Sequence, residues 1–477
     1  MTGLHMKPIF KCVAVAAAIA VLTGCASVNF EQTLSQTNEA TSAFTEGKLE
    51  LSRSPQQAQE RDKLSKELLA APLNMNGAVQ LALANSPAMQ TLLAQSWADM
   101  ARANQTGRIA NPIFTFERNR FGSELELQRL LSFGLLDILT LPQRQAIASR
   151  QVTQAKVQLS ANVIEQVTQV RQAWVRAVAA QQSVQYAEQV KASAQASAEL
   201  AKRMQQVGNF NKLQRARQQV FYADAAAQLA SSQHTATATR EELVRQLGLT
   251  DAQSAQLQLP ARLPDLPAAP MEPSVVTTNA TAQRLDVQMA RNQLDIAGQS
   301  QNLNLLTSVI DVELGVRRDT VIDNAAGTNT PRKGYELAIR LPLFDWGTSR
   351  RDLMNAQSMA AASRYESTTR NASSQLRESY SAYRTAYDVA RHYRDEIVPL
   401  RKAMAEENQL RYNGMLIGVF ELLADSRDQI SSVTAAINAQ QQFWLANAAL
   451  AASMTGKPTS TAMMAAPVAG SSSAAGH

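Results

Sequence analysis

The sequence predicts a mainly α-helical chain with a transmembrane β part, built from a duplicated helix–β-hairpin–long helix–helix unit. Three observations predict this fold class. Marker residues recur at a nearly constant offset, two long stretches lack glycine, and four short segments alternate apolar and polar residues. Aromatic residues make up only 5% of the chain, while alanine, glutamine and serine are abundant. This composition is typical of long helices that pack closely through small side chains.

Residues 1–24 are predicted to be a signal peptide. Two lysines precede the apolar run 13–22, which is too short to span a bilayer. Leu-Thr-Gly directly before Cys25 resembles a bacterial lipobox, which implies that Cys25 becomes the lipidated first residue, carrying palmitate or a similar acyl chain. Ala26 follows it, as in lipoproteins sorted to the outer membrane. An ordinary signal peptide with a chance cysteine is the alternative. We expect residues 25–74 to form an N-terminal periplasmic segment with a lipid anchor.

Chemistry-bearing residues are sparse. The two cysteines are Cys12 and Cys25, so signal removal and acylation would leave no thiol for a disulfide, a zinc site or catalysis. The four histidines are scattered, and the sequence has no nucleophile elbow or glycine-rich phosphate loop. Basic residues do not cluster with aromatic ones, which argues against nucleic-acid binding. We predict no enzyme activity, no cofactor and no metal site.

The rest of the chain is predicted to hold two structural repeats, residues 75–250 and 276–456. Residues 251–275 between them contain five prolines and should form an extended connector. The tail 457–477 has low complexity and is expected to be disordered. The markers of duplication are like residues 206 or 208 positions apart: Asp137 and Asp345, Arg171 and Arg377, Trp174 and Tyr380, Gly208 and Gly414, and Gly248 and Gly456.

Each repeat is expected to contain a first helix, a hairpin, a very long helix and a return helix. The expected helices are about 76–105, 143–207 and 209–247 in the first repeat, and 276–302, 348–413 and 419–455 in the second. A helix of about 65 residues is on the order of 100 Å long. Such a length suits a bundle or coiled coil and not a globular core. Pro399 should interrupt the second long helix.

Two β-hairpins are predicted at equivalent places in the repeats. The expected strands lie within about 112–132 (112–119 and 124–132), and at 308–317 and 334–343, the last two joined by a polar loop over 318–333. Their alternation suits a transmembrane barrel with lipid on one side and water on the other. A sheet lying on a soluble core is the alternative. Four strands cannot close, and lipid tolerates no open sheet edge, so several chains would have to share one barrel.

Together these features resemble the TolC-like outer-membrane efflux proteins, in the branch anchored by lipid. The resemblance covers about residues 75–456 and rests on the duplicated plan, on LPLFDWGTSRR at 341–351 and on RYNGMLIGVFELLADSR at 411–427. It implies a homotrimer with one twelve-stranded outer-membrane barrel, continued by a periplasmic α-helical tunnel. It further implies passive export of small molecules, drugs or metal ions, from a proton-driven inner-membrane pump and a periplasmic adaptor (membrane fusion) protein.

The resemblance also assigns roles to individual residues. The turns after the long helices, with Gly208 and Asn209 in one and Gly414 and Met415 in the other, would be the periplasmic tips that contact the adaptor.

A pore constriction is predicted near the second tip. Family members often carry acidic residues six and nine positions after the second tip glycine, where this chain has Phe420 and Leu423. Glu421 and Asp425 stand close by, but a one-residue step turns a helical side chain by about 100°. We predict an apolar constriction at Phe420 or Leu423; packing of both side chains between helices is the alternative.

The junction between barrel and tunnel is predicted at Pro342, Trp346 and Gly347. Glycine eases a sharp change of direction, and tryptophan favours the lipid interface. The sequence leaves open whether Pro342 or Gly347 makes the bend.

Other functions remain open at this point. A structural coiled-coil periplasmic lipoprotein would explain the long helices and Cys25, but not two hairpins at equivalent places. An envelope hydrolase would need a recognisable set of catalytic polar residues, which the sequence lacks. The outer-membrane component of type I protein secretion would share the expected fold.

Overall fold

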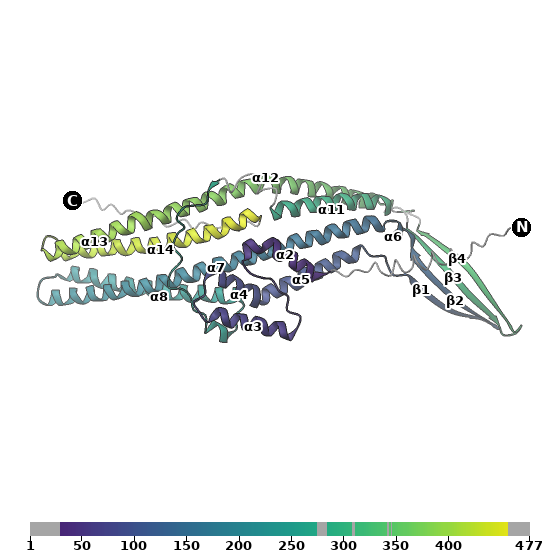
Figure 1. The fold of residues 1–477 in the computed structure, drawn as a ribbon, viewed down its shortest axis with the longest axis horizontal. Coiled ribbons are helices and arrows are strands. Elements are labelled where there is room, and N and C mark those ends of the chain that lie inside the picture. Colours follow the sequence, from purple (N-terminus) through teal and green to yellow (C-terminus); the bar gives the residue numbers. More distant parts are fainter. Residues whose placement is uncertain (1–28, 274–283, 308–310, 341–342, 345, 457–477) are drawn as a thin grey trace. The chain divides into compact units, whose positions relative to one another are not determined.

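The computed structural model describes residues 29–273, 284–307, 311–340, 343–344 and 346–456 (Figure 1). The chain divides into two compact units, one of residues 1–40, 93–159 and 289–367 and the other of residues 41–92, 160–288 and 368–477. Each unit combines segments of both predicted repeats, so the duplication remains a prediction from the sequence. The predicted signal peptide, Cys25 and the tail 457–477 lie outside the described residues.

The first unit contains a four-stranded antiparallel sheet. Its strands are β1 (Ile113–Phe121), β2 (Glu124–Gly134), β3 (Asp311–Asp323) and β4 (Thr328–Arg340), in the order β1-β2-β3-β4. The four predicted strands are therefore confirmed. β2 pairs with β3 from Glu124↔Asp323 to Gly134↔Glu313, so hairpins far apart in the sequence join into one sheet.

The predicted polar loop over 318–333 is wrong. β3 and β4 continue through it, pairing from Asp311↔Arg340 to Asp323↔Thr328, and the turn is only residues 324–327. Asp323 closes this turn, since its carboxylate accepts from the backbone N–H of Ala325 at 2.8 Å. A polar composition does not prevent a strand when a partner strand supplies the hydrogen bonds.

Helices of the first unit lead away from the sheet. α6 (Leu135–Leu139) follows β2 directly and precedes α7 (Leu141–Gln206), while α11 (Leu285–Thr307) comes before β3. Arg144 on α7 pairs with Asp137 on α6 at 2.7 Å, and Arg150 pairs with Asp295 on α11 at 2.7 Å. These pairs fix the start of the long helix beside its neighbours.

The second unit contains the greater part of two long helical hairpins, and these parts lie side by side in Figure 1. One joins α7 to α8 (Lys212–Leu247). The other joins α12 (Thr348–His392) and α13 (Val398–Asn413) to α14 (Val419–Thr455). The predicted long and return helices are thus confirmed, with bounds shifted by at most three residues.

The predicted interruption at Pro399 is also confirmed. Residues Tyr393–Ile397 form one π-helical turn between α12 and α13, and Pro399 is the second residue of α13, after Val398. Proline lacks the N–H that would donate to the carbonyl four residues earlier, so the helix widens locally instead of continuing as a regular α-helix.

The predicted first helices need two corrections. The helix expected at 76–105 is two helices, α4 (Met75–Asn85) and α5 (Pro87–Thr106), because Ser86 precedes a proline and is extended with ψ 121°. The helix expected at 276–302 is described only from 284 onward, where α11 begins at Leu285 and runs to Thr307.

The N-terminal segment contains α2 (Phe30–Thr45) and α3 (Pro55–Leu69), and Arg171 on α7 holds part of it. Arg171 Nη2 donates to the Phe44 carbonyl at 2.6 Å, and the guanidinium lies 4.7 Å from the Phe44 ring centroid. Burial lowers the pKa of the Arg171 guanidinium, while Glu46 opposes this shift. The chain after α2 is therefore attached to the long helix by a largely buried cation.

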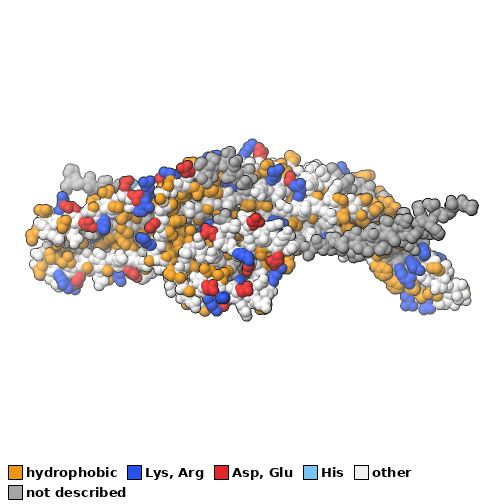
Figure 2. All heavy atoms as spheres, viewed as in Figure 1, with side chains coloured by type: hydrophobic (Ala, Val, Ile, Leu, Met, Phe, Trp, Pro, Cys, Tyr) orange, Lys and Arg blue, Asp and Glu red, His pale blue; other side chains and the backbone are white. Residues whose placement is uncertain are grey.

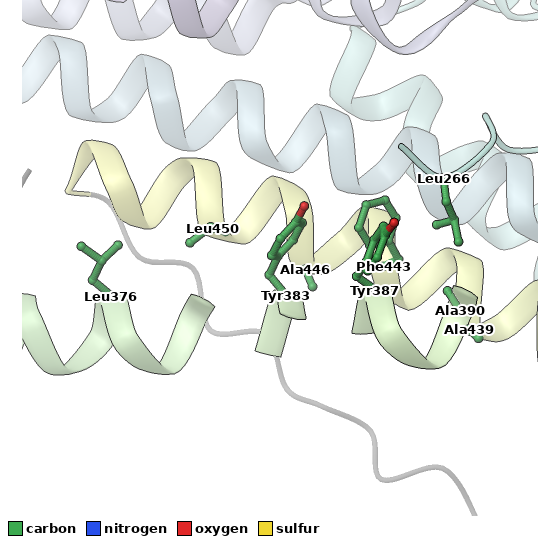
Figure 3. Close-up of a cluster of buried hydrophobic side chains, with 9 residues drawn as sticks. All are labelled: Leu266, Leu376, Tyr383, Tyr387, Ala390, Ala439, Phe443, Ala446 and Leu450. Carbon is green, nitrogen blue, oxygen red and sulfur yellow. The ribbon is translucent and has the colours of Figure 1, made fainter. Parts of the chain in front are cut away.

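An aromatic cluster forms part of the core of the second unit (Figure 3). It brings together residues of α12, α14 and the connector: Leu266, Leu376, Tyr383, Tyr387, Ala390, Ala439, Phe443, Ala446 and Leu450. The Phe443 ring centroid lies 5.6 Å from that of Tyr383 and 5.7 Å from that of Tyr387. Tyr387 donates to the Pro267 carbonyl at 3.1 Å, so the proline-rich connector is tied to the helices.

Phe443→Leu is expected to lower the free energy of unfolding by about 1–2 kcal/mol, because the smaller side chain leaves part of the space empty and loses three aromatic contacts, with Tyr383, Tyr387 and Trp444. Urea unfolding followed by circular dichroism would measure it. The same substitution at Phe344, which is 99% exposed, is the control and should change stability far less. Equal effects would show that the cluster does not hold the unit together.

Candidate functional site

The turn between α7 and α8 contains the first predicted tip. Gly208 has φ +83°, in the left-handed region that favours glycine, and the Asn209 N–H donates to the Met204 carbonyl at 2.8 Å. Asn211 and Gln214 then form a reciprocal cap at the start of α8, with both hydrogen bonds at 2.8 Å. The tip is a tight turn in which Gly208 and Asn209 are exposed.

The second tip uses a different residue in the left-handed region. Met415 has φ +60°, whereas Gly414, the predicted turn residue, has φ −79°. The Gly414 N–H donates to the Leu410 carbonyl at 2.9 Å and the Met415 N–H to the Tyr412 carbonyl at 2.9 Å. Met415 is 93% exposed, and Leu410 and Leu416 are exposed beside it. The second tip is therefore an apolar turn.

Three side chains connect the two hairpins of the second unit. The Tyr186 hydroxyl donates to the Ile430 carbonyl at 3.5 Å, and burial raises the pKa of the Tyr186 phenol. Arg427 lies over the Phe221 ring, 4.4 Å from its centroid, and donates to the Arg217 carbonyl at 3.5 Å. Sequence reasoning missed these contacts, because partners more than 200 residues apart leave no local pattern.

The predicted constriction residues all lie in the first two turns of α14. Leu423 is half-buried, and the side chain of Phe420 lies outside the described part of the chain. The two acids differ: Glu421 is exposed, whereas Asp425 is buried. Within the described residues, Asp425 Oδ2 has no hydrogen-bond partner. The pore role of these four residues remains a prediction.

The predicted junction lies directly before α12. Gly347 has φ +70° and α12 begins at the next residue, so the left-handed conformation of Gly347 redirects the chain there. Trp346 is exposed, and its carbonyl accepts from Arg351 Nη2 at 2.7 Å. Pro342 lies outside the described residues. Of the two predicted candidates for the bend, Gly347 has a bend-forming conformation.

The sheet has two chemically different faces. Residues paired across antiparallel strands point to the same side, and alternate residues of one strand point to opposite sides. We call one side the apolar face; its apolar side chains are Phe114, Phe116, Leu125, Leu127, Leu131, Phe133, Val312, Leu314, Val316, Ile322, Tyr335, Leu337 and Ile339. We call the other side the acidic face; its acids with described side chains are Glu117, Glu124, Glu126, Glu313, Asp319, Asp323 and Glu336.

The apolar face is uncovered in the chain by itself. Phe114 is 63% exposed and Leu337 59% exposed. Among the described residues, β1 and β4 each pair with one strand only, so each has an edge of unpaired backbone groups. A sheet that exposes both apolar side chains and open edges needs further partners.

Two kinds of feature are absent from the described residues. No helix there is long and apolar enough to cross a membrane. No group of three His, Cys, Asp or Glu side chains there is placed to hold a metal ion.

No protein-family model matches the chain, and no curated protein matches its sequence. Several solved structures do match its fold. A membrane protein from Pseudomonas aeruginosa is 18% identical, with a TM-score of 0.68 over 80% of this chain and 93% of that chain. The outer membrane protein VceC from Vibrio cholerae is 16% identical, with a TM-score of 0.67 over 80% of this chain and 96% of its own. The MtrE outer membrane channel of Neisseria gonorrhoeae is 17% identical, with a TM-score of 0.65 over 80% and 89%.

Proposed function

We propose that this chain is the outer-membrane channel of a tripartite efflux system. The proposal is supported by the fold of the chain, which is similar to that of outer-membrane channels and agrees with the predicted TolC-like resemblance at the level of the fold. The channel is a passive trimeric conduit, anchored by lipid at Cys25, that carries small molecules from a proton-driven inner-membrane pump and a periplasmic adaptor to the exterior. It works without a cofactor, because transport through an open conduit requires no chemical step.

The observation that carries this proposal is the open sheet with an exposed apolar face. Lipid can cover the apolar side chains, but lipid does not satisfy the backbone groups at the edges of β1 and β4. Copies of the chain that pair edge to edge satisfy these backbone groups and leave the apolar face to the lipid. Three chains of four strands make a closed barrel of twelve strands. A purely helical periplasmic scaffold leaves such a sheet unexplained.

The acidic face would then line the aqueous lumen. The seven described carboxylates of this face outnumber its three described cations, Arg317, Arg332 and Arg340, so the lumen of the barrel would attract cations. The exposed turns at Gly208–Asn209 and Gly414–Met415 would be the surfaces for the adaptor. Met415 and Leu416 supply apolar area there that an adaptor can bury.

The purified full-length protein should appear in outer-membrane fractions as a cross-linkable trimer and should form channels in planar bilayers. Phe420→Ala should increase the single-channel conductance severalfold if Phe420 narrows the pore, whereas Leu410→Ala, at an exposed position on α13, should leave it unchanged. A monomer in the periplasmic fraction without channel activity would refute the proposed function. Unchanged conductance of Phe420→Ala would refute only the constriction.

A further inference from the structure

The apolar face carries positive charge and no negative charge. Its only charged residues in the described strands are cations: Arg118, Arg120, Arg129, Arg318 and Lys333. The seven acids of the sheet whose side chains are described all point to the other side. Figure 2 shows lysine and arginine side chains beside hydrophobic ones over the sheet. Charged side chains are costly against hydrocarbon, so a surface that contacts only hydrocarbon is not expected to carry five cations. This charge pattern therefore points to an anionic partner.

Three of these cations form a row across neighbouring strands. Arg318 on β3 pairs directly with Lys333 on β4. The flanking pairs Leu127↔Thr320 and Leu130↔Arg317 place Arg129 opposite Arg318 on the other side. Neighbouring strands lie about 4.8 Å apart, and like charges directly opposite one another destabilise a sheet. None of the three forms an ion pair with a described residue.

The row lies beside a hollow that has room for an anion. The hollow is about 580 Å³ and is lined by Arg129, Arg318, Thr320, Asn329 and Pro331, all on the apolar face. Arg129 Nη1 donates to the Thr320 hydroxyl at 3.2 Å, which orients the guanidinium. Arginine binds phosphate through two parallel hydrogen bonds, and lysine adds a mobile point charge.

On β4 the row lies at the end of the apolar residues that continues toward the turn. From Lys333 to Ile339 is a step of six residues, on the order of 20 Å of strand, in which Tyr335 and Leu337 share the face with Ile339. Beyond Lys333 the strand leads only to the turn at 324–327, whereas its other end leads toward α12. If the helices are periplasmic, the cations face the outer leaflet.

We infer that Arg129, Arg318 and Lys333 bind the phosphate groups of the phosphorylated glycolipid of the outer leaflet, lipopolysaccharide, through its lipid A headgroup. The inference rests on the proposed function, because it requires this face to meet lipid. A membrane lipid fits better than free phosphate, since its acyl chains cover the exposed apolar side chains below the cations while its phosphates offset the like-charge row. The long arginine and lysine side chains reach the headgroup level from the strand.

The test measures binding of diphosphoryl lipid A to the full-length trimer by native mass spectrometry in detergent, with dephosphorylated lipid A and inorganic phosphate as comparison probes. Wild-type protein should bind the diphosphoryl form most strongly, and the affinity should fall with added salt. The triple variant Arg129→Gln, Arg318→Gln, Lys333→Gln should have an affinity for diphosphoryl lipid A that is lower by about tenfold or more, given the usual strength of charged hydrogen bonds.

Neighbouring residues supply the matched control. Arg332→Gln removes the same charge from the acidic face and should leave binding unchanged, whereas Lys333→Gln should weaken it and Lys333→Arg should preserve it. Equal binding of dephosphorylated lipid A, equal loss in Arg332→Gln, or unchanged binding by the triple variant would overturn the inference. A normal channel that retains no lipid A overturns this inference alone, whereas a chain that never enters an outer membrane overturns the proposed function with it.

Discussion

Gly248→Ala is expected to destabilise the second unit by about 2–5 kcal/mol. Gly248 ends α8 with φ +66°, and a side chain in this left-handed conformation costs about 1–2 kcal/mol. A Cβ at this position would lie 2.4 Å from Cδ of Pro87 and 2.7 Å from Cα of Ser86. These atoms belong to a backbone turn and a rigid ring, so relieving the overlap adds about 1–3 kcal/mol. Thermal unfolding followed by circular dichroism would measure the loss.

Gly208→Ala is the matched control for this prediction. Gly208 has φ +83°, but a Cβ there would meet no atom of the described chain within 4 Å. Only the cost of a side chain in the left-handed conformation applies here, so the free energy of unfolding should fall by about 1–2 kcal/mol. Gly456→Ala should behave like Gly248→Ala, since its Cβ would lie 2.6 Å from the backbone nitrogen of Leu285 at the start of α11. Equal losses at Gly208 and Gly248 would show that the close approach to Ser86 does not matter.

Leu337→Arg is expected to prevent stable insertion into the outer membrane. Leu337 lies on the apolar face, and an arginine facing lipid near the middle of a barrel costs about 2–4 kcal/mol in each chain. A trimer would carry this cost three times, which is comparable with the whole stability of many proteins. Membrane fractionation and cross-linking would detect the loss of the trimer from the outer membrane.

Ala338→Arg is the control for the direction of the side chain. Ala338 is the next residue of β4, is exposed, and lies on the acidic face, where water would fill the lumen. Its trimer should remain in the outer membrane, although the added charge should change the ion selectivity of the channel. Insertion of both variants would mean that the apolar face does not meet lipid, and failure of both would mean that the strand tolerates no arginine at all.

Much of the fold was accessible from the sequence because the informative signals are local. Two long segments without glycine predicted α7 and the helix formed by α12 and α13, a proline predicted the interruption between α12 and α13, and alternation predicted the four strands. The predicted tips also lie at turns. The equivalence of Gly248 and Gly456 was visible as one offset, and each proves to end a helix in the left-handed conformation against the start of another helix.

The kinds of element, their order and the places where the chain turns can all be predicted from local sequence, since helix and strand periods depend on neighbours within a few residues. The length of β3 and β4 comes instead from tertiary pairing, because polar residues become strand when a partner strand satisfies their backbone groups. The fold has two further effects of this kind. It also decided that Met415, not Gly414, takes the left-handed conformation. Finally, it decided that Arg129 lies beside Arg318, because the register between two distant hairpins comes from pairing and not from any local pattern.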